Sequence, residues 1–465
     1  MAAPQVLTLE DAIRIARAHH PSVEATRAQL EAARARLSQA RAQFLPGVTG
    51  SFSYQPQTAN FALSPGFKRL LDTPSSGLAS VLSTSGAPIT AQCVPPMNPD
   101  GSFDFSGVCQ SPPPPAAAPA DYQLFNYWAA SLGIYWTAFD WGRTIYGYRA
   151  ARTAVDAQAL STRASEADVV LNVKLAYYGA LAADAAERVA IEALATQNRH
   201  LDQARAFLAV GSKTKIDVAS AESDTAAAEL SLARARGGVE SARAQLSAAI
   251  GEDPFRDYTL VTPPESADAE TIANPPPALD TLVDEALATR PEPEALRLQA
   301  RSLADTARAL RGSYLPSLVL QAGPTWGGVD LASLTTNFSI TVSLTYPITG
   351  MNPFLVHAQV KEAQATAAVA RAQERAERNQ VRLETAQARA GIDSAREAVK
   401  AAQKLVAAAR ERRDLAEGRY DAGVGSILEL SDAELNYVNA ELQSVQSTLT
   451  LAQARAELDH ALGRL

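Results

Sequence analysis

NFSITVSLTY, residues 337–346, alternates from its second residue on between apolar side chains and the hydroxyl-bearing side chains of serine and threonine. The apolar positions are Phe338, Ile340, Val342, Leu344 and Tyr346. A period of two indicates a β-strand with one apolar and one polar face. A similar alternation occurs in residues 130–137, so the signal appears twice. Such faces suit a wall between lipid and water, but an amphipathic strand of a soluble sheet would show the same pattern.

Composition narrows the class of protein. The chain has 465 residues, of which 47% are hydrophobic but only 6% aromatic, and alanine supplies much of the apolar content. Alanine favours helices and fills little core volume, so we expect long, thin helical packing. The formal net charge of −8 argues against a sequence-independent nucleic-acid binder, which needs a basic surface. No apolar run approaches the roughly 18 residues of a membrane-spanning helix, so a membrane span would have to be a closed β-barrel.

Two halves of the chain share one pattern of proline breaks and glycine turns. The break FLP at 44–46 returns as YLP at 314–316. Residues 209–222 align without gaps to residues 421–434. A match of this length and order indicates an internal duplication.

The duplication predicts three segments. Residues 1–252 form the first structural repeat, and within it residues 55–121 form a long loop insert rich in Pro, Ser, Gly and Ala. Residues 253–278 form a proline-rich crossover linker, and residues 279–465 form the second repeat.

Both cysteines, Cys93 and Cys109, lie inside the insert at 55–121. Two cysteines so close together in a loop suggest a disulfide in an oxidising compartment. Two free thiols in a reducing compartment are the alternative.

Heptad spacing marks the helices that follow the glycine turns. Every seventh residue from Val218 to Leu246 is followed three residues later by alanine. The second half repeats this seam from Leu430 to Leu458, with alanine or serine at the small positions. Such narrow seams are typical of coiled-coil packing at close approach. Residues 143–208 contain no proline, so a single helix there would extend about 100 Å at 1.5 Å per residue.

Each repeat is therefore predicted as a helix, a strand, a loop, a strand, a long helix, a tight turn and a final helix. Two repeats supply four strands, whereas a barrel with a filled interior needs about eight. Several copies of the chain are therefore expected to contribute to one barrel.

The chain resembles the TolC family of outer-membrane efflux channels over nearly its whole length. The resemblance rests on the duplicated architecture, the FLP and YLP breaks, the FDWGR sequence at 139–143 and the two glycine turns. It implies an α+β membrane protein, a homotrimer in which four strands per subunit form a shared twelve-strand transmembrane β-barrel. A long α-helical coiled-coil barrel is expected to continue it.

The resemblance also implies a location and partners. The location is the outer membrane of a Gram-negative bacterium, with the helices extending into the periplasm. Residues 1–5 lack the charged and apolar regions of a secretion signal, so we expect the numbering to begin after a removed signal peptide. The implied partners are outer-membrane lipid, a periplasmic adaptor (membrane fusion) protein and an inner-membrane transporter.

The two glycine turns between long helices are the expected tips of the helical part. Glycine permits the positive φ that stops one helix, and Ser212 or Ser426 is expected to help start the next. The resemblance implies that these tips dock the adaptor, at Val210, Gly211, Ser212, Ala422, Gly423 and Val424.

Acidic residues follow the second turn. Glu429 and Asp432 are three positions apart on one helical face. The resemblance implies that they line a periplasmic gate, which Tyr420 and Asp217 help to hold shut. Three copies would gather six carboxylates, whose field would favour cations and raise some pKa values. A solvated acidic face near a helix start is the plainer interpretation.

One position departs from the family pattern. Gly425 stands where the best-known member has an arginine that completes the lock. Lys213 or Lys215 is the candidate substitute.

Catalysis has little support in the sequence. The five histidines are scattered, no glycine-rich phosphate loop is present, and neither cysteine has a metal-ligand partner at a recognised spacing. We therefore predict no enzyme, no cofactor and no metal site. The predicted function is a passive, gated exit duct of a tripartite efflux or type I secretion system. The main alternative is a soluble coiled-coil scaffold or interaction protein.

Overall fold

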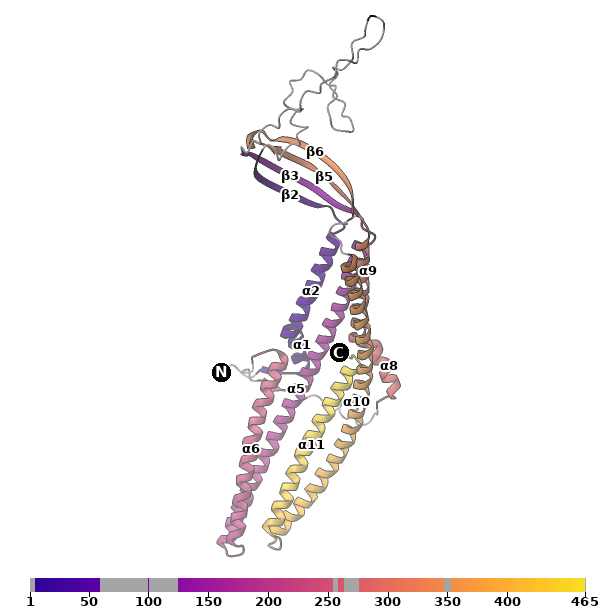
Figure 1. Ribbon diagram of the computed structural model, residues 1–465. Helices are drawn as coiled ribbons and strands as arrows, with labels where there is room; N and C mark the ends of the chain where they lie inside the picture. Colours follow the sequence, from indigo (N-terminus) through magenta and orange to yellow (C-terminus); the bar gives the residue numbers. More distant parts are fainter. Residues whose placement is uncertain are drawn as a thin grey trace. The chain divides into compact units, whose positions relative to one another are not determined.

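The computed structural model separates into two units (Figure 1), which are described one at a time. The helical unit comprises residues 1–43, 141–315 and 347–465, and the sheet unit comprises residues 44–140 and 316–346. The residues that the structure describes are 5–58, 99, 124–253, 258–262, 276–346 and 353–464. Among the helices in these ranges, none combines the length and the hydropathy that crossing a membrane would require.

The order of elements occurs twice along the chain. The first set is β1 (Gln5–Leu7), α1 (Leu9–His19), α2 (Pro21–Ala42), β2 (Gly47–Thr58), β3 (Leu124–Phe139), α5 (Arg143–Ala209) and α6 (Lys215–Ile250). The second set is β4 (Tyr258–Leu260), α8 (Leu279–Thr289), α9 (Pro291–Arg311), β5 (Ser317–Gly328), β6 (Thr335–Thr345), α10 (Pro353–Asp421) and α11 (Ile427–Ala461). Short 3₁₀ turns, η1 (Gly312–Tyr314) and η2 (Leu331–Ser333), flank β5. The predicted duplicated unit is thereby confirmed, while the domain boundaries at 252 and 279 stay a prediction.

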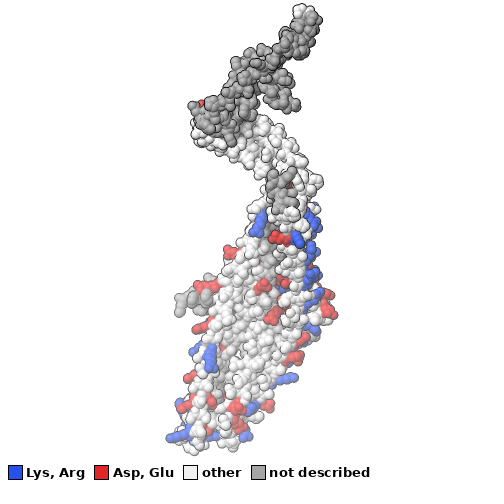
Figure 2. Space-filling view, in the orientation of Figure 1, with Lys and Arg blue, Asp and Glu red and all other residues white. Residues whose placement is uncertain are grey.

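The sheet unit is one four-stranded antiparallel sheet with the order β2-β3-β5-β6. The central pair β3–β5 joins the two halves of the duplication, and β2 and β6 are the edge strands. None of the residues in these four strands is charged, and the sheet atoms in Figure 2 are accordingly white where they are not grey. The alternation that predicted β6 is confirmed.

Strands β2 and β3 are both longer than the sequence predicted. Strand pairing continues to Thr58 opposite Leu124, so the first four residues of the predicted insert at 55–121 belong to β2. These residues show no apolar alternation, and their backbone pairing extends the ladder instead. Pro56 is tolerated because β2 is an edge strand.

The helical unit is built around two long helices, α5 and α10. Helix α5 packs beside α2 and α9 over one part of its length and beside α6 and α11 over the other (Figure 1). Helix α10 packs beside α9, α8 and α11. The prediction of one unbroken helix over 143–208 is confirmed.

The heptad seam of α6 is confirmed by burial. Thr225, Leu232, Val239 and Leu246 are buried, and the alanines that follow them are mostly half-buried. The larger core clusters lie at equivalent places in the two repeats. One gathers β1 and α1 against α5 and α6, and the other gathers α8 against α10 and α11.

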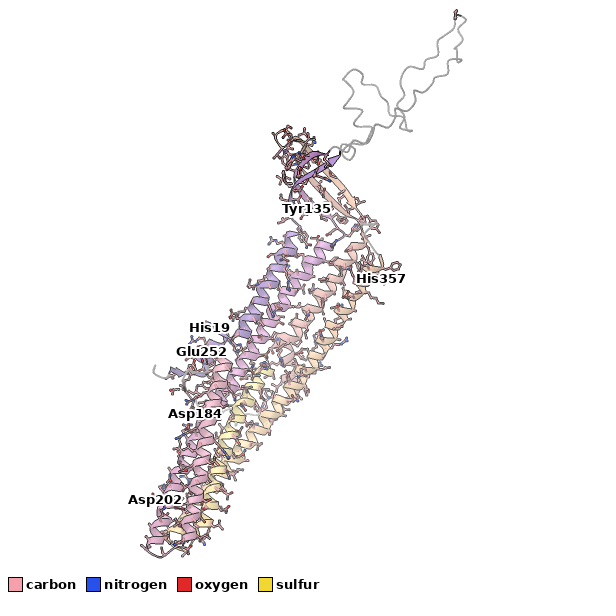
Figure 3. All side chains as sticks on the ribbon, turned by 60° about the vertical axis from the view of Figure 1, so that its left-hand side comes forward. His19, Tyr135, Asp184, Asp202, Glu252 and His357 are labelled. Carbon is pink, nitrogen blue, oxygen red and sulfur yellow. The ribbon has the colours of Figure 1, made fainter. Side chains whose placement is uncertain are left out.

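A second, two-stranded sheet was not predicted. Strand β4 lies inside the expected linker 253–278 and pairs in parallel with β1. The Tyr177 hydroxyl of α5 lies 3.0 Å from the Leu7 carbonyl oxygen and 2.6 Å from the Val261 carbonyl oxygen. Three-residue strands carry too little alternation to be seen in sequence, and their pairing needs α5 beside them. In Figure 3, the labelled His19 and Glu252 lie close together where α1 meets the end of α6.

Candidate functional site

The candidate site is formed by the two turns that end the helical hairpins α5–α6 and α10–α11. Gly211 has φ 72° and Gly423 has φ 77°, so both turns use the left-handed conformation that glycine tolerates best. In the first turn, the Ser212 amide donates to the Phe207 carbonyl at 3.0 Å. In the second, the Val424 amide donates to the Arg419 carbonyl, also at 3.0 Å. The two tips therefore share one geometry, as the aligned sequences predicted.

The helix that follows each turn begins with a side-chain cap. In α11 the cap is Ser426, whose hydroxyl accepts from the Glu429 amide at 3.1 Å, as predicted. In α6 the cap is Thr214, and the prediction that Ser212 starts the helix is wrong. The Ser212 hydroxyl instead donates to the Phe207 carbonyl. Ser212 lies two residues before the N-cap position of α6, which is too early in the chain to cap that helix.

Asp217 completes the start of α6. Its carboxylate accepts from the Thr214 amide at 2.7 Å and from the Thr214 hydroxyl at 2.8 Å. These hydrogen bonds lower the pKa of Asp217, because they favour the charged carboxylate. Asp217 is therefore held by its own helix.

Lys213 joins the two hairpins. Its Nζ donates to the Gly425 carbonyl at 2.7 Å and lies 4.8 Å from the centre of the Tyr420 ring. A Cβ at Gly425 would lie 2.9 Å from the Tyr420 backbone nitrogen, so this turn has no room for any side chain. Of the two candidate lysines, Lys213 is therefore the one that contacts Gly425 among the described residues.

Tyr420 is fully buried beneath these turns. Its ring meets the Phe207 ring edge-on at 5.8 Å between centres, which links α10 to α5. Burial raises the pKa of Tyr420, and the negative charges of Asp217 and Asp421 raise it further, so the phenol stays neutral. Its hydroxyl has no hydrogen-bond partner among the described residues and so forms no hydrogen bond with Asp217.

Both predicted gate carboxylates have a basic neighbour on α10. Glu429 lies 3.3 Å from Arg419, and Asp432 forms a short ion pair with Arg412. All four side chains are about half exposed, so each pair contributes about 0–1 kcal/mol. The expected acidic surface therefore carries two compensating cations, which sequence spacing could not reveal because the pairs depend on how α10 packs against α11.

Deeper polar contacts also join the hairpins. His200 of α5 and Glu434 of α11 are almost fully buried, with 3.5 Å between Nε2 and Oε1. Gln203 donates to Asp421 at 2.5 Å, and Ser431 forms a short hydrogen bond with Asp224. In Figure 3, the labelled Asp202 marks the neighbouring turn of α5, close to the tip. None of these residues was singled out from the sequence.

The predicted docking residues lie at the surface of both tips. Val210 is 77% exposed and Val424 is 73% exposed, with Gly211, Ser212, Ala422 and Gly423 exposed beside them. Cys93 and Cys109 lie outside the described residues. Within the described part of the chain, no cluster of three or more metal-ligating side chains occurs.

Comparison with known proteins identifies a family. Residues 118–252 and 282–464 match the model of the family described as outer membrane efflux protein. No curated protein matches the sequence of this chain.

Several solved structures share the fold at low sequence identity. The outer-membrane channel OprN superimposes with a TM-score of 0.74 at 16% identity, covering 98% of this chain and 89% of that chain. The outer membrane protein VceC of Vibrio cholerae gives 0.73 at 18% identity, covering 98% and 96%. The MtrE outer membrane channel of Neisseria gonorrhoeae, solved in its open state, gives 0.71 at 20% identity, covering 98% and 88%.

Proposed function

Because the chain belongs to the outer membrane efflux protein family, whose members are transport channels and not enzymes, we propose that it is a passive exit duct gated at its helical tips. Three copies form the duct, and a periplasmic adaptor and an inner-membrane pump of a tripartite efflux or type I secretion system supply the driving force. Outer-membrane lipid surrounds the strands.

The observation that carries this proposal is the exposed apolar face of β6. Phe338, Ile340, Val342 and Leu344 are each about two-thirds exposed in the single chain. A soluble sheet would bury such a face against a second layer. An uncharged sheet that leaves it open is instead suited to contact with lipid tails, with the serine and threonine face toward water.

The edges of the sheet support closure by further copies. Within the described residues, β2 and β6 each pair on one side only, and their outer backbone groups need partners in a lipid environment. The four strands alternate in direction, so β6 of one copy can pair antiparallel with β2 of the next. A ring of identical contacts of this kind closes with no free edge.

The tips support a gate. Lys213 bonds the hairpin α5–α6 to the carbonyl of Gly425 in the hairpin α10–α11, and it lies on the ring of the buried Tyr420. Parting the hairpins breaks both contacts. We assign Lys213 the locking role, with Tyr420 as the surface that it covers. Asp217 positions Lys213 indirectly, because its hydrogen bonds to Thr214 fix the start of α6 at Lys215, two residues beyond Lys213.

Glu429 and Asp432 are proposed to line the entrance, partly neutralised by Arg419 and Arg412. Val210 and Val424, the most exposed apolar residues of the two turns, are proposed to contact the adaptor. Covering apolar side chains that are exposed at a helical tip removes apolar surface from water, which favours binding of a partner there.

Two single substitutions on β6 test the membrane assignment. Val342→Lys places a charge on the apolar face and is expected to abolish recovery of trimer from the outer-membrane fraction, since lysine in the lipid costs about 2–4 kcal/mol. Thr341→Lys places the same charge on the neighbouring polar face and is expected to leave trimer yield and single-channel conductance in planar bilayers intact.

The alternative of a soluble scaffold makes the opposite prediction. In a soluble monomer with the exposure of the single chain, Val342 and Thr341 would both face water, and both variants would behave alike. A monomer that remains stable without detergent, and for which Val342→Lys matches Thr341→Lys, would exclude the channel and leave the scaffold.

A further inference from the structure

An open cavity between α9 and α10 is lined by arginine. Its volume is about 240 Å³, and its lining comprises Ala304, Ala307, Arg308, Arg311, Gln364, Ala367 and Arg371. Ala307 and Ala367 are buried and form the floor, while the three arginines and Gln364 are exposed at the rim. Basic side chains gather along the α9–α10 edge of the helical unit in the view of Figure 2.

The cavity carries positive charge that no acidic side chain of its lining balances. Arg308 pairs with the buried carboxylate of Asp305 at 2.7 Å and stands over the Tyr146 ring, so its guanidinium is held in place. Arg311 and Arg371 have no ion pair or hydrogen bond among the described residues, and the lining contains no acidic side chain. Two uncompensated cations therefore share one concave surface.

Helix electrostatics account for only part of this arrangement. The macrodipole favours basic residues in the last turn of α9, which explains Arg308 and Arg311. Arg371 lies well inside α10, where the dipole gives no preference. It lines the cavity opposite the end of α9, so it adds a guanidinium there that the helix dipoles do not explain.

The donors match a phosphate group. Guanidinium groups present N–H donors in a planar fork that binds phosphate oxygens in pairs, and the Gln364 amide adds a neutral donor. The alanine floor leaves the space in which the anion can approach the three arginines together. Carboxylates offer only two oxygens, so a tetrahedral oxyanion uses this donor set more fully.

We infer that Arg308, Arg311 and Arg371 form a binding site for one phosphate group per chain. Two sources have this chemistry, inorganic phosphate and the headgroup of an anionic phospholipid. The lipid source rests on the proposed function, because Arg311 stands six residues before Ser317, the first residue of β5. If β5 lies in a bilayer, only residues 312–316 of the chain separate Arg311 from that strand.

Isothermal titration calorimetry on the full chain in dodecyl maltoside tests the site. The injected probes are inorganic phosphate, dihexanoyl phosphatidylglycerol and, as the zwitterionic comparison, dihexanoyl phosphatidylcholine, each lipid below its micelle concentration. We expect saturable binding of one anion per chain. Removing one charge-assisted partner weakens it roughly ten- to hundredfold, so Arg311→Ala and Arg371→Ala should each lose at least tenfold.

Arg375→Ala is the matched control. Arg375 lies one helical turn beyond Arg371 and is exposed, but it does not line the cavity. Arg375→Ala therefore changes the net charge of the chain as much as Arg371→Ala does, without removing a residue of the site. Its affinity should stay within about fivefold of that of the native chain, since an exposed charge one helical turn away attracts the anion through solvent but donates no hydrogen bond to it.

The titrations distinguish a lipid site, a site for free phosphate and the absence of a site. Tighter binding of phosphatidylglycerol than of phosphate identifies a lipid site, and comparable binding identifies a site for free phosphate. The inference is overturned if neither anion saturates, or if Arg375→Ala weakens binding as much as Arg371→Ala. A trimer that conducts normally but binds neither anion would reject this site and leave the proposed channel intact.

Discussion

Replacing Lys213 with methionine is the most direct test of how the two hairpin tips are held together. The substitution keeps the length and apolar body of the side chain but removes the ammonium group. It thereby removes the 2.7 Å hydrogen bond to the Gly425 carbonyl and the contact with the Tyr420 ring. A hydrogen bond from a charged donor contributes about 1.5–3 kcal/mol, and a cation–π contact contributes about 0.5–1 kcal/mol at exposed sites.

Lys213 is only half-buried, so solvent screening reduces this sum to about 2 kcal/mol per chain. At 1.4 kcal/mol per tenfold change, the ratio of parted to closed hairpins rises roughly thirtyfold in each subunit. Single-channel recording in planar bilayers measures this as a larger open fraction for Lys213→Met than for the native channel. Lys215→Met is the control, because Lys215 is exposed, carries the same charge and has no contact across the hairpins among the described residues.

Two results would refute the reasoning. The open fraction of Lys213→Met would match that of the native channel if the lock lay elsewhere. It would match that of Lys215→Met if only the total charge at the tip mattered. A higher salt concentration should reduce the difference in open fraction between the native channel and Lys213→Met, since salt screens partly exposed charges.

Three further substitutions test other parts of the helical unit. Tyr177→Phe removes the hydroxyl that joins α5 to Leu7 of β1 and to Val261 after β4. It is expected to lower the free energy of unfolding by about 1–3 kcal/mol, measured as a lower thermal unfolding midpoint. An unchanged midpoint would contradict this. Burial raises the pKa of Glu377 above its ordinary value of 4.5, so the folded chain binds the proton more tightly and this group favours unfolding as pH rises. Glu377→Gln should therefore raise the unfolding midpoint at pH 7, with the gain vanishing near pH 4, and a gain equal at both pH values would exclude burial as its cause. Ser426→Ala removes the cap of α11 and should speed amide exchange in its first turn by the equivalent of about 1 kcal/mol, whereas Ser212→Ala should leave the first turn of α6 unchanged.

Local features of the fold could be predicted because each depends on residues that are near one another in the chain. The alternation of residues 338–346 defines the faces of β6 wherever that strand lies. The positive φ of Gly211 and Gly423 follows from the need to stop one helix and start another within a few residues. The cap at Ser426 is likewise a contact between positions three apart.

Errors in prediction came where local signals were weak. Ser212 and Thr214 are both good caps, and only the length of the turn after Gly211 selects Thr214. Strand β4 is three residues long, and β2 continues past its apolar alternation to Thr58 because β3 offers backbone partners there.

The amino-acid sequence by itself therefore determined the repeated order of elements, the two-faced strands and the glycine tips, since these follow from periodicity and backbone preference. Only the tertiary structure decided which side chains meet: Lys213 reaches the Gly425 carbonyl 212 positions away, and Arg412 reaches Asp432. It also decided that Arg308, Arg311 and Arg371 share a cavity. Contacts of this kind depend on which helices are neighbours and on their register, and neither quantity is encoded in the spacing of residues along a single helix.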